Sequence, residues 1–157
     1  MLTETPCVSI VTSVFNGDKY LEETIKSILD QTYSNIQYII IDGGSTDNTL
    51  DIIKNYEDKI DYWISEKDYG VYEAWNKGLD VCRGNWIGFI GSDDYYELNA
   101  IEKYIEYINL FSKIEYVSSQ SFLIEKDKQV IKKIGNAWNW QDFSRYMNIA
   151  HVGSLHH

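Results

Sequence analysis

The segment that most constrains the fold is a strand without a polar face. Residues 36–41 read Ile-Gln-Tyr-Ile-Ile-Ile and lack the alternation of apolar and polar side chains that is typical of a half-exposed strand. Near-continuous apolar runs of this kind are typical of parallel sheets, because crossover helices cover both faces of such sheets. We therefore expect a parallel sheet between two layers of helices.

The rest of the chain alternates between strand-like and helix-like segments. Short runs rich in β-branched residues predict strands over 7–14, 36–41, 60–65 and 85–90. Apolar residues three and four positions apart predict helices over 18–31, 46–56, 71–81 and 98–111. This alternation predicts an α/β fold, a mostly parallel, doubly wound sheet with flanking helices and right-handed crossovers.

The pattern changes after residue 111. Strands over 115–125 and 129–134 flank Lys126-Asp127-Lys128 and predict a hairpin, and residues 139–147 predict a short helix. His156 and His157 are excluded from the candidate site residues, because a terminal histidine pair is also what a purification tag leaves. A length of 157 residues fits one domain, 1–157.

Charge excludes one class of partner. The chain has 24 Asp and Glu against 14 Lys and Arg, a formal net charge of -10. Proteins hold nucleic acid mainly through clustered Lys and Arg, and this sequence has no such cluster, so we expect no nucleic-acid partner. To bind a small anion such as a nucleotide, so acidic a chain needs a divalent cation or helix N-termini to offset the repulsion.

Compartment signals favour the cytoplasm. Residues 1–6 lack a basic start followed by an apolar stretch, so we expect no signal peptide. No window approaches the roughly 18 uninterrupted apolar residues that a membrane span needs. Cys7 and Cys82, in a chain long enough for a full core, fit a reduced, cytoplasmic protein better than one held by a disulfide.

Polar residues follow each of the four predicted parallel strands. The clusters are Ser13 to Asn16, Asp42-Gly43-Gly44, Ser65 to Gly70, and Ser92-Asp93-Asp94. In an open α/β sheet, ligands bind outside the carboxyl ends of the strands. One site can therefore collect all four clusters.

In two of these clusters, each aspartate fits either a structural role in its own turn or a role in binding a ligand. Asp93 and Asp94 directly follow the strand over 85–90 and either cap the next helix or bind a hard divalent cation through their oxygens. Asp42 either stabilises the turn before Gly43-Gly44 or accepts hydrogen bonds from a nucleobase imide or a ribose hydroxyl. Neither pattern alone decides between the two.

Other polar positions carry weaker signals. Thr12, Ser13 and Asn16 either hydrogen-bond a ligand or bond their own loop. Asn76 and Gly78 are poor helix formers inside a predicted helix, and such exceptions often mark functional sites. No Gly-x-Gly-x-x-Gly motif follows the first strand and no Walker Gly-Lys-Ser/Thr motif occurs, which argues against a dinucleotide or phosphate-loop protein.

Three ordered segments identify a family resemblance. Residues 7–33 (CVSIVTSVFNGDKYLEETIKSILDQTY), 38–53 (YIIIDGGSTDNTLDII) and 64–96 (ISEKDYGVYEAWNKGLDVCRGNWIGFIGSDDYY) resemble the inverting family 2 glycosyltransferases, which have the GT-A fold, the nucleotide-diphospho-sugar transferase-like fold. The likeness is greatest to the bacterial branch that builds capsule, exopolysaccharide and lipopolysaccharide. It runs in register over about 7–110, and residues 111–157 resemble the family only loosely.

The resemblance implies roles for individual residues. It places the following residues around the nucleotide of the donor: Thr12, Val14, Asn16, Asp42, Glu66, Lys67, Asp68, Asn76, Lys77 and Asp93. Within this set, Asp42 would bind the base, usually uracil, and Asn76 and Lys77 would face the diphosphate. Asp93 and Asp94 match the metal-binding Asp-x-Asp region, where Mn²⁺ or Mg²⁺ bridges the donor phosphates, although Gly91 replaces the first aspartate of that motif.

The implied reaction moves a sugar from a nucleotide-diphosphate donor, usually a UDP-sugar, to an acceptor hydroxyl with inversion. The acceptor would be a saccharide or a lipid-linked saccharide, used in cell-surface polysaccharide synthesis at the inner face of the membrane. The family's catalytic base lies well after the metal motif, and we expect it beyond residue 157. The chain is therefore expected to be the donor-binding half of a longer enzyme, truncated in its C-terminal part.

Two other functions fit the same residues. The first is a non-catalytic module that binds a nucleotide sugar on the same fold. The second is a nucleotidyltransferase, which attacks phosphorus instead of the anomeric carbon. Nucleotidyltransferases of related topology favour a glycine-rich basic loop after the first strand, and residues 11–20 (VTSVFNGDKY) lack one.

Overall fold

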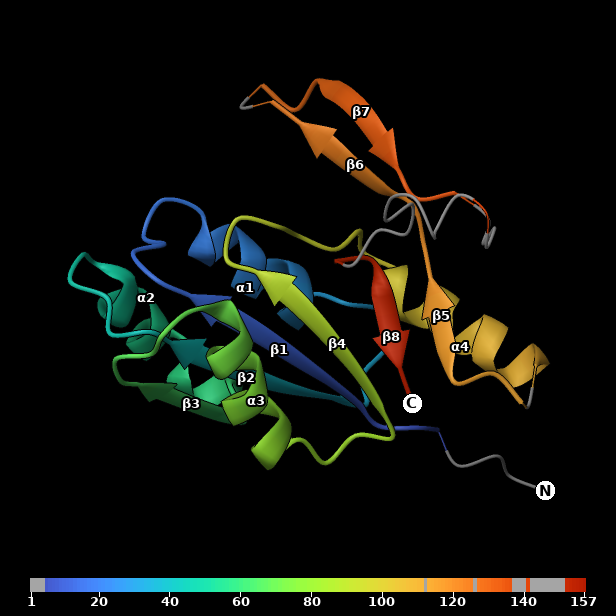
Figure 1. Ribbon diagram of the computed structural model, residues 1–157, viewed down its shortest axis with the longest axis horizontal. Helices are drawn as coiled ribbons and strands as arrows, with labels where there is room; N and C mark the ends of the chain where they lie inside the picture. The colour runs from blue at the N-terminus through green and yellow to red at the C-terminus, as the bar shows by residue number, and fades with distance from the viewer. Residues whose placement is uncertain (1–4, 112, 126, 137–140, 142–151) are drawn as a thin grey trace.

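The chain forms an α/β domain around one mixed sheet. The computed structural model describes residues 5–111, 113–125, 127–136, 141 and 152–157. Its main sheet has six strands in the order β3-β2-β1-β4-β8-β5, and β6 and β7 form a separate two-stranded sheet (Figure 1). None of the helices in these described ranges is long and apolar enough to cross a membrane.

Four parallel strands form the half of the sheet predicted from the sequence. Their bounds are β1 Val8–Val14, β2 Ile36–Asp42, β3 Tyr62–Ser65 and β4 Trp86–Gly91. β1 pairs in parallel with both β2 and β4, and β2 pairs in parallel with β3. The predicted strand ends are correct to within two residues, and the parallel pairing confirms the predicted topology.

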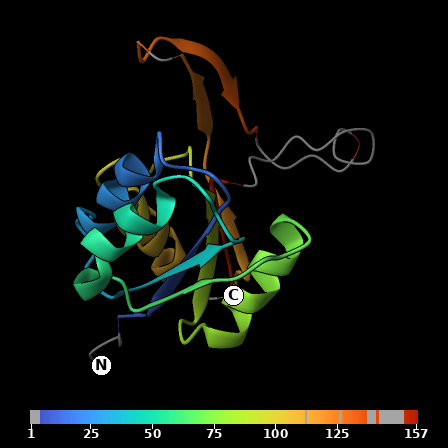
Figure 2. The same cartoon turned by 90° about the vertical axis from the view of Figure 1, so that its left-hand side faces the viewer.

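Helices cover both faces of this sheet. Those that pack on one face are α1 (Leu21–Leu29), α2 (Thr49–Asn55) and α4 (Ala100–Leu110), with a short 3-10 turn, η1 (Glu57–Lys59), after α2. The opposite face is covered by α3 (Val71–Val81), and the turned view separates the two helix layers (Figure 2). The apolar strand over 36–41 is therefore buried from both sides, as its sequence predicts.

Alternate residues of the strands fill two separate cores. Ile10 and Ile40 pack toward α1, α2 and α4, whereas Val11 and Ile41 pack toward Ala74 of α3. The approach on the α3 side is close, because a Cβ on Gly78 would lie 2.5 Å from Cγ1 of Val11. Gly78 thus lets α3 lie directly on β1, and this packing explains a poor helix former inside a helix.

The second half of the chain differs from the prediction. The single strand expected over 115–125 is two strands, β5 (Tyr116–Ser118) in the main sheet and β6 (Ser121–Ile124), which pairs with β7 (Val130–Ile134). Ser119 and Gln120 separate them, and Ser119 donates its main-chain N–H to the carbonyl of Gly153 at 2.7 Å. The predicted hairpin is present and consists of β6 and β7, which lie outside the main sheet (Figure 1). The first residues of the expected strand, which form β5, belong to the main sheet instead.

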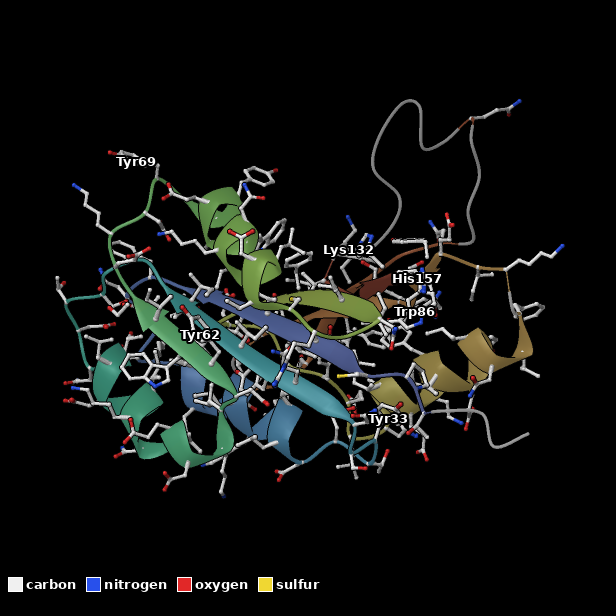
Figure 3. All side chains as sticks on the ribbon, turned by 90° about the horizontal axis from the view of Figure 1, so that it is seen from below. Tyr33, Tyr62, Tyr69, Trp86, Lys132 and His157 are labelled. Atoms are coloured by element: carbon white, nitrogen blue, oxygen red, sulfur yellow. The ribbon has the colours of Figure 1, made fainter. Side chains whose placement is uncertain are left out.

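An unpredicted strand joins the two halves of the sheet. β8 (Ser154–His156) pairs antiparallel with both β4 and β5. His156 is therefore a strand residue, and the centroid of its ring lies 4.9 Å from the ring centroid of Tyr116. His157 packs edge-on against Trp86 at 5.2 Å (Figure 3). The helix predicted over 139–147 falls outside the described residues, except at Gln141.

Candidate functional site

The sheet brings the four polar strand ends to one edge. Val14 pairs with Asp42, Asp42 pairs with Ser65, and Ser13 pairs with Gly91 across the parallel strands. The carboxyl ends of β1, β2, β3 and β4 therefore lie side by side. This is the arrangement that the sequence predicts for a shared binding edge.

Asp42 is the most deeply buried of the candidate carboxylates. Its side chain is fully buried and accepts hydrogen bonds from the main-chain N–H groups of Gly44 and Ser45, at 3.1 and 3.0 Å, and from the hydroxyl of Ser65 at 2.6 Å. The Ser45 hydroxyl also donates to it. In this structure the carboxylate ties its own loop to β3. The base-binding role implied for Asp42 stays a prediction.

Thr12 and Asn16 also make contacts inside the protein. Thr12 is fully buried, and its hydroxyl shares a 3.1 Å hydrogen bond with that of Tyr38 in the core. Asn16 has φ 51°, and its side-chain oxygen accepts the N–H of Thr46 at 2.9 Å. The main-chain N–H of Asn16 donates to the Ser45 hydroxyl at 2.7 Å. These contacts fix the β1–α1 loop against the loop after β2.

A cavity of about 440 Å³ opens beside the ends of β1 and β2. It is lined by Ser13, Val14, Phe15, Gly43, Lys67, Asp68, Gly70, Val71 and Ala74. Of the residues predicted for the nucleotide, Val14, Lys67 and Asp68 reach it. Sequence reasoning missed Phe15, which lines the cavity and is 64% exposed. The available signal was its position, an aromatic residue directly after a buried strand.

Asp68 directs its carboxylate toward Gly43. Its Oδ1 accepts the main-chain N–H of Gly70 at 3.0 Å, and its Oδ2 lies 2.9 Å from the position that a Cβ on Gly43 would take. Any side chain at 43 would therefore compete with this carboxylate for space. The carboxylate that borders the cavity is thus that of Asp68, whereas Asp42 is buried and does not line it.

Glu66, Asn76 and Lys77 do not line this cavity. The amino group of Lys77 lies 2.9 Å from a carboxylate oxygen of Glu66 and 3.4 Å from one of Glu73. The hydrogen bond that Lys77 donates to Glu66, together with the negative charge of Glu66 and Glu73, raises the pKa of Lys77. Asn76 is exposed on α3. Tyr69, in the same β3–α3 loop, points outward from its tip (Figure 3).

A second cluster of carboxylates, Asp93 and Asp94, lies directly after β4. We call residues 92–98 the acidic loop. Oδ1 of Asp93 and Oδ2 of Asp94 lie 3.1 and 3.0 Å from the position that a Cβ on Gly91 would take. Two carboxylate oxygens thus converge on the space left open by the missing side chain of Gly91. Burial, together with the nearby charge of Asp93, raises the pKa of Asp94, although a hydrogen bond with Gly91 opposes this rise.

These two carboxylates fit a divalent cation as a partial ligand set. Burial and, to a smaller extent, the charge of Asp93 disfavour the ionised form of Asp94, and a bound cation would offset both effects. Among the described residues, no third His, Cys, Asp or Glu joins them in a metal-binding group. Mg²⁺ in proteins is often held by one or two carboxylates together with water and phosphate oxygens, so a diphosphate would complete such a site.

The cavity and the acidic loop are neighbours. A Cβ on Gly17 would lie 2.6 Å from Cγ2 of Val14, which lines the cavity, and 2.9 Å from Oγ of Ser92 in the acidic loop. Gly17 therefore lies between them, and its lack of a side chain lets the two approach. On the other side, Asp93 and Asp94 border a larger cleft of about 820 Å³ against α4, β5 and the β6–β7 hairpin.

Comparison with known proteins places this arrangement in a family. The family model described as "Glycosyl transferase family 2" matches residues 9–149. The chain belongs to this family. The resemblance seen in the three sequence segments is thereby confirmed.

Curated relatives are longer than this chain. TuaG of Bacillus subtilis (strain 168), whose name assigns it to teichuronic acid biosynthesis, is 38% identical over 107 residues, which are 66% of this chain and 42% of TuaG. Chondroitin synthase of Escherichia coli is 31% identical over 147 residues, which are 92% of this chain and 21% of that protein. The chain thus spans about two fifths of TuaG and one fifth of chondroitin synthase.

Solved structures share the fold. S. aureus TarS 1-349 in complex with UDP-GlcNAc superposes with a TM-score of 0.66 at 21% identity, covering 80% of this chain and 37% of that 1-349 chain. The mannosyltransferase PcManGT of Pyrobaculum calidifontis, in complex with GDP-Man and Mn²⁺, gives a TM-score of 0.67 at 18% identity, covering 78% of this chain and 37% of that protein. The predicted GT-A fold is confirmed.

Proposed function

We propose that this chain binds the nucleotide-sugar donor of a glycosyltransferase that acts in cell-surface polysaccharide synthesis. The observation that carries the proposal is the pairing of two features at one sheet edge, the cavity with the Asp68 carboxylate and the acidic loop with Asp93 and Asp94. Family membership supports sugar transfer, and the ligands named for TarS and PcManGT support a nucleotide-sugar donor.

The cavity suits a nucleobase with an imide N–H. An ionised carboxylate only accepts hydrogen bonds, and Oδ1 of Asp68 already accepts the N–H of Gly70. Its Oδ2 is then suited to one donor, such as N3–H of uracil. Cytosine has no hydrogen at N3, and its N4 amino donor lies one ring position away, so a carboxylate placed to meet N3 favours uracil. The exposed ring of Phe15 provides a face on which a base can stack. We therefore propose a uridine diphosphate sugar as the donor.

The acidic loop is the proposed site for the diphosphate, with Mn²⁺ or Mg²⁺. Asp93 and Asp94 would hold the ion, which would supply positive charge to the departing diphosphate. Lys67 lines the neighbouring cavity and brings a positive charge near the donor. Without a cation, the formal net charge of -10 would oppose the binding of a diphosphate.

The proposed transfer is a single displacement. The acceptor hydroxyl oxygen forms a bond to the anomeric carbon while the bond from that carbon to the diphosphate breaks on the opposite face, which inverts the configuration. A carboxylate base takes the hydroxyl proton, and the nucleoside diphosphate leaves. The base and the saccharide or lipid-linked acceptor are assigned to the longer enzyme, on the cytoplasmic side of the membrane. Residues 1–157 are its donor-binding domain.

Titration calorimetry with UDP and CDP in the presence of Mn²⁺ tests the donor proposal. We expect UDP to bind more tightly than CDP, and Asp68→Asn to remove this preference because an amide can also donate a hydrogen bond to N3 of cytosine. Equal binding of both nucleotides by the unmodified chain would contradict the proposed role of Asp68. In the longer enzyme, release of pyrophosphate instead of a nucleoside diphosphate would contradict sugar transfer.

A further inference from the structure

Side chains of α1 form hydrogen bonds with the main chain of the acidic loop. Thr24 is buried, and its hydroxyl lies 2.9 Å from the carbonyl oxygen of Ser92 and 2.7 Å from that of Asp94. These two carbonyls flank Asp93 in the sequence. One hydroxyl of α1 therefore fixes the main chain on both sides of a proposed metal ligand.

The contacts continue along the same face of the helix. The main-chain N–H of Tyr96 donates to the hydroxyl of Ser27 at 3.2 Å, and that hydroxyl donates to the carbonyl of Thr24 at 2.8 Å. The side-chain amide of Gln31 donates to the carbonyl of Glu97 at 2.8 Å. Its oxygen accepts the N–H of Ile101, in the first turn of α4, at 3.1 Å. Thr24 and Ser27 lie one helical turn apart on α1, and Gln31 lies two residues beyond the end of that helix. The three side chains form one polar stripe.

This polar stripe rests on a rigid support. Leu21, Ile25 and Ile28 of the same helix are buried in the main core against the sheet. The contact from the N–H of Asp94 to the carbonyl of Gly91, the last residue of β4, is long, at 3.3 Å. The position of the loop therefore depends on α1, because α1 supplies hydrogen-bond partners to the carbonyls of Ser92 and Asp94 and to the N–H of Tyr96.

We infer that Thr24, Ser27 and Gln31 are positioning residues that hold the acidic loop so that the carboxylates of Asp93 and Asp94 converge over Gly91. The inference rests on the proposed function for its ligand, a divalent cation, but its geometric part concerns the loop alone. Thr24 carries the largest share, because its hydroxyl contacts the two carbonyls nearest the carboxylates. Removing that hydroxyl should free the loop and separate the two ligands.

The test compares three variants of the 157-residue chain. Thr24→Val removes the hydroxyl at nearly constant volume, and Thr24→Ser keeps it. Ser9→Ala is the matched control, because the buried Ser9 hydroxyl also makes two hydrogen bonds, to Gln37 and from Gly84, 2.6 and 2.8 Å long, but lies near the other end of β1. Amide hydrogen exchange of residues 92–98 is measured without ligand, and the Mn²⁺ dependence of UDP binding is measured by calorimetry.

Thr24→Val should speed exchange in residues 92–98 by about tenfold, because the carbonyls of Ser92 and Asp94 lose the one hydroxyl proton that they share. It should also weaken the apparent Mn²⁺ affinity by about 10- to 100-fold, the usual effect of removing a group that orients metal ligands. UDP affinity without metal should stay unchanged. In both Thr24→Ser and Ser9→Ala, the exchange rates of residues 92–98 and the apparent Mn²⁺ affinity should match those of the unmodified chain.

Unchanged exchange of residues 92–98 in Thr24→Val would overturn the inference, and so would an equal loss of Mn²⁺ affinity in Ser9→Ala. Failure of Thr24→Ser to restore the metal response would overturn it as well. Absence of Mn²⁺-dependent UDP binding in the unmodified chain would instead overturn the proposed function. In that case the exchange measurement still decides whether Thr24 positions the loop.

Discussion

Gly43 and Asp68 share one space at the candidate site. Oδ2 of Asp68 lies 2.9 Å from the position that a Cβ on Gly43 would occupy, so the carboxylate fills the place of a missing side chain. The two residues come from the ends of different strands and are 25 positions apart in the sequence. The glycine is therefore as much a part of the cavity as the carboxylate.

This contact makes Gly43→Ala a test of the base-binding cavity. The new methyl group should push the Asp68 side chain aside, and loss of one charged hydrogen bond should weaken UDP binding by about 10- to 100-fold. The unfolding free energy should change by less than about 1 kcal/mol, because the atom displaced is the end of a flexible side chain. Calorimetry and urea unfolding measure the two effects.

A double variant provides the control for Gly43→Ala. If the substitution acts through Asp68, then Gly43→Ala should cause no further loss of UDP affinity in a chain that already carries Asp68→Ala. Additive losses would show that Gly43 affects the ligand by another route.

Asp42→Ala should lower stability more than it lowers binding to the folded protein. It leaves the N–H groups of Gly44 and Ser45 and the hydroxyl of Ser65 without their buried acceptor. We expect a loss of about 3 kcal/mol or more in the free energy of unfolding, measured in urea. A variant that keeps the original stability but loses UDP binding would show that Asp42 contacts the base, as the family resemblance implies.

Asp94 should make the binding of Mn²⁺ sensitive to acid. Burial and the charge of Asp93 raise its pKa, so protonation competes with the cation at a higher pH than for an ordinary aspartate. The Mn²⁺ affinity measured at a series of pH values should fall as pH is lowered through this raised pKa. In Asp93→Asn the fall should begin at lower pH, because the neighbouring negative charge is gone. The same midpoint in both proteins would contradict this coupling.

Without metal, the ionised carboxylate of Asp94 should reduce the free energy of unfolding of the chain at neutral pH. A pKa that is raised in the folded state means that the contribution of Asp94 to stability is fully present below its unfolded-state pKa and is lost as pH rises through its folded-state pKa. Asp94→Asn should therefore melt at a higher temperature than the unmodified chain at pH 7, with the difference vanishing in acid. A lower melting temperature for Asp94→Asn at pH 7 would contradict the assigned environment.

Gly78→Ala should destabilise the domain in spite of the better helix propensity of alanine. The propensity gain is about 1 kcal/mol, whereas a methyl group 2.5 Å from Cγ1 of Val11 overpacks the interface at a cost of about 1–3 kcal/mol. We expect a net loss in the free energy of unfolding by urea. In a Val11→Ala background the added methyl group has room, and the same substitution should stabilise; a loss there would refute the packing explanation.

The first half of the fold could be predicted because its signals are local. Apolar periodicity predicts α3 over 71–81, the same residues that form Val71–Val81, and the parallel strands agree within two residues. β8 could not be predicted in this way, because its three residues gain their strand conformation from pairing with β4 and β5, far away in the sequence. The split between β5 and β6 also depends on a distant contact, from Ser119 to Gly153.

The candidate site was predictable at the level of strand ends but not of side-chain direction. The sequence places Asp42, Asp68 and Asp93 at the correct edge, because parallel strands bring their carboxyl ends together. It cannot tell that Asp42 bonds its own loop while Asp68 reaches the cavity, since both orientations suit a carboxylate after a strand. That distinction comes from contacts between residues 42, 45 and 65, which local patterns do not contain.

Calorimetric titration of UDP, with and without Mn²⁺, tests the central claim most directly. We expect Mn²⁺ to strengthen UDP binding to the unmodified chain, and Asp93→Ala and Asp94→Ala each to remove most of that gain while the chain stays folded. Binding of UDP that is indifferent to Mn²⁺ and to both substitutions, or no binding of UDP under any of these conditions, would contradict the account.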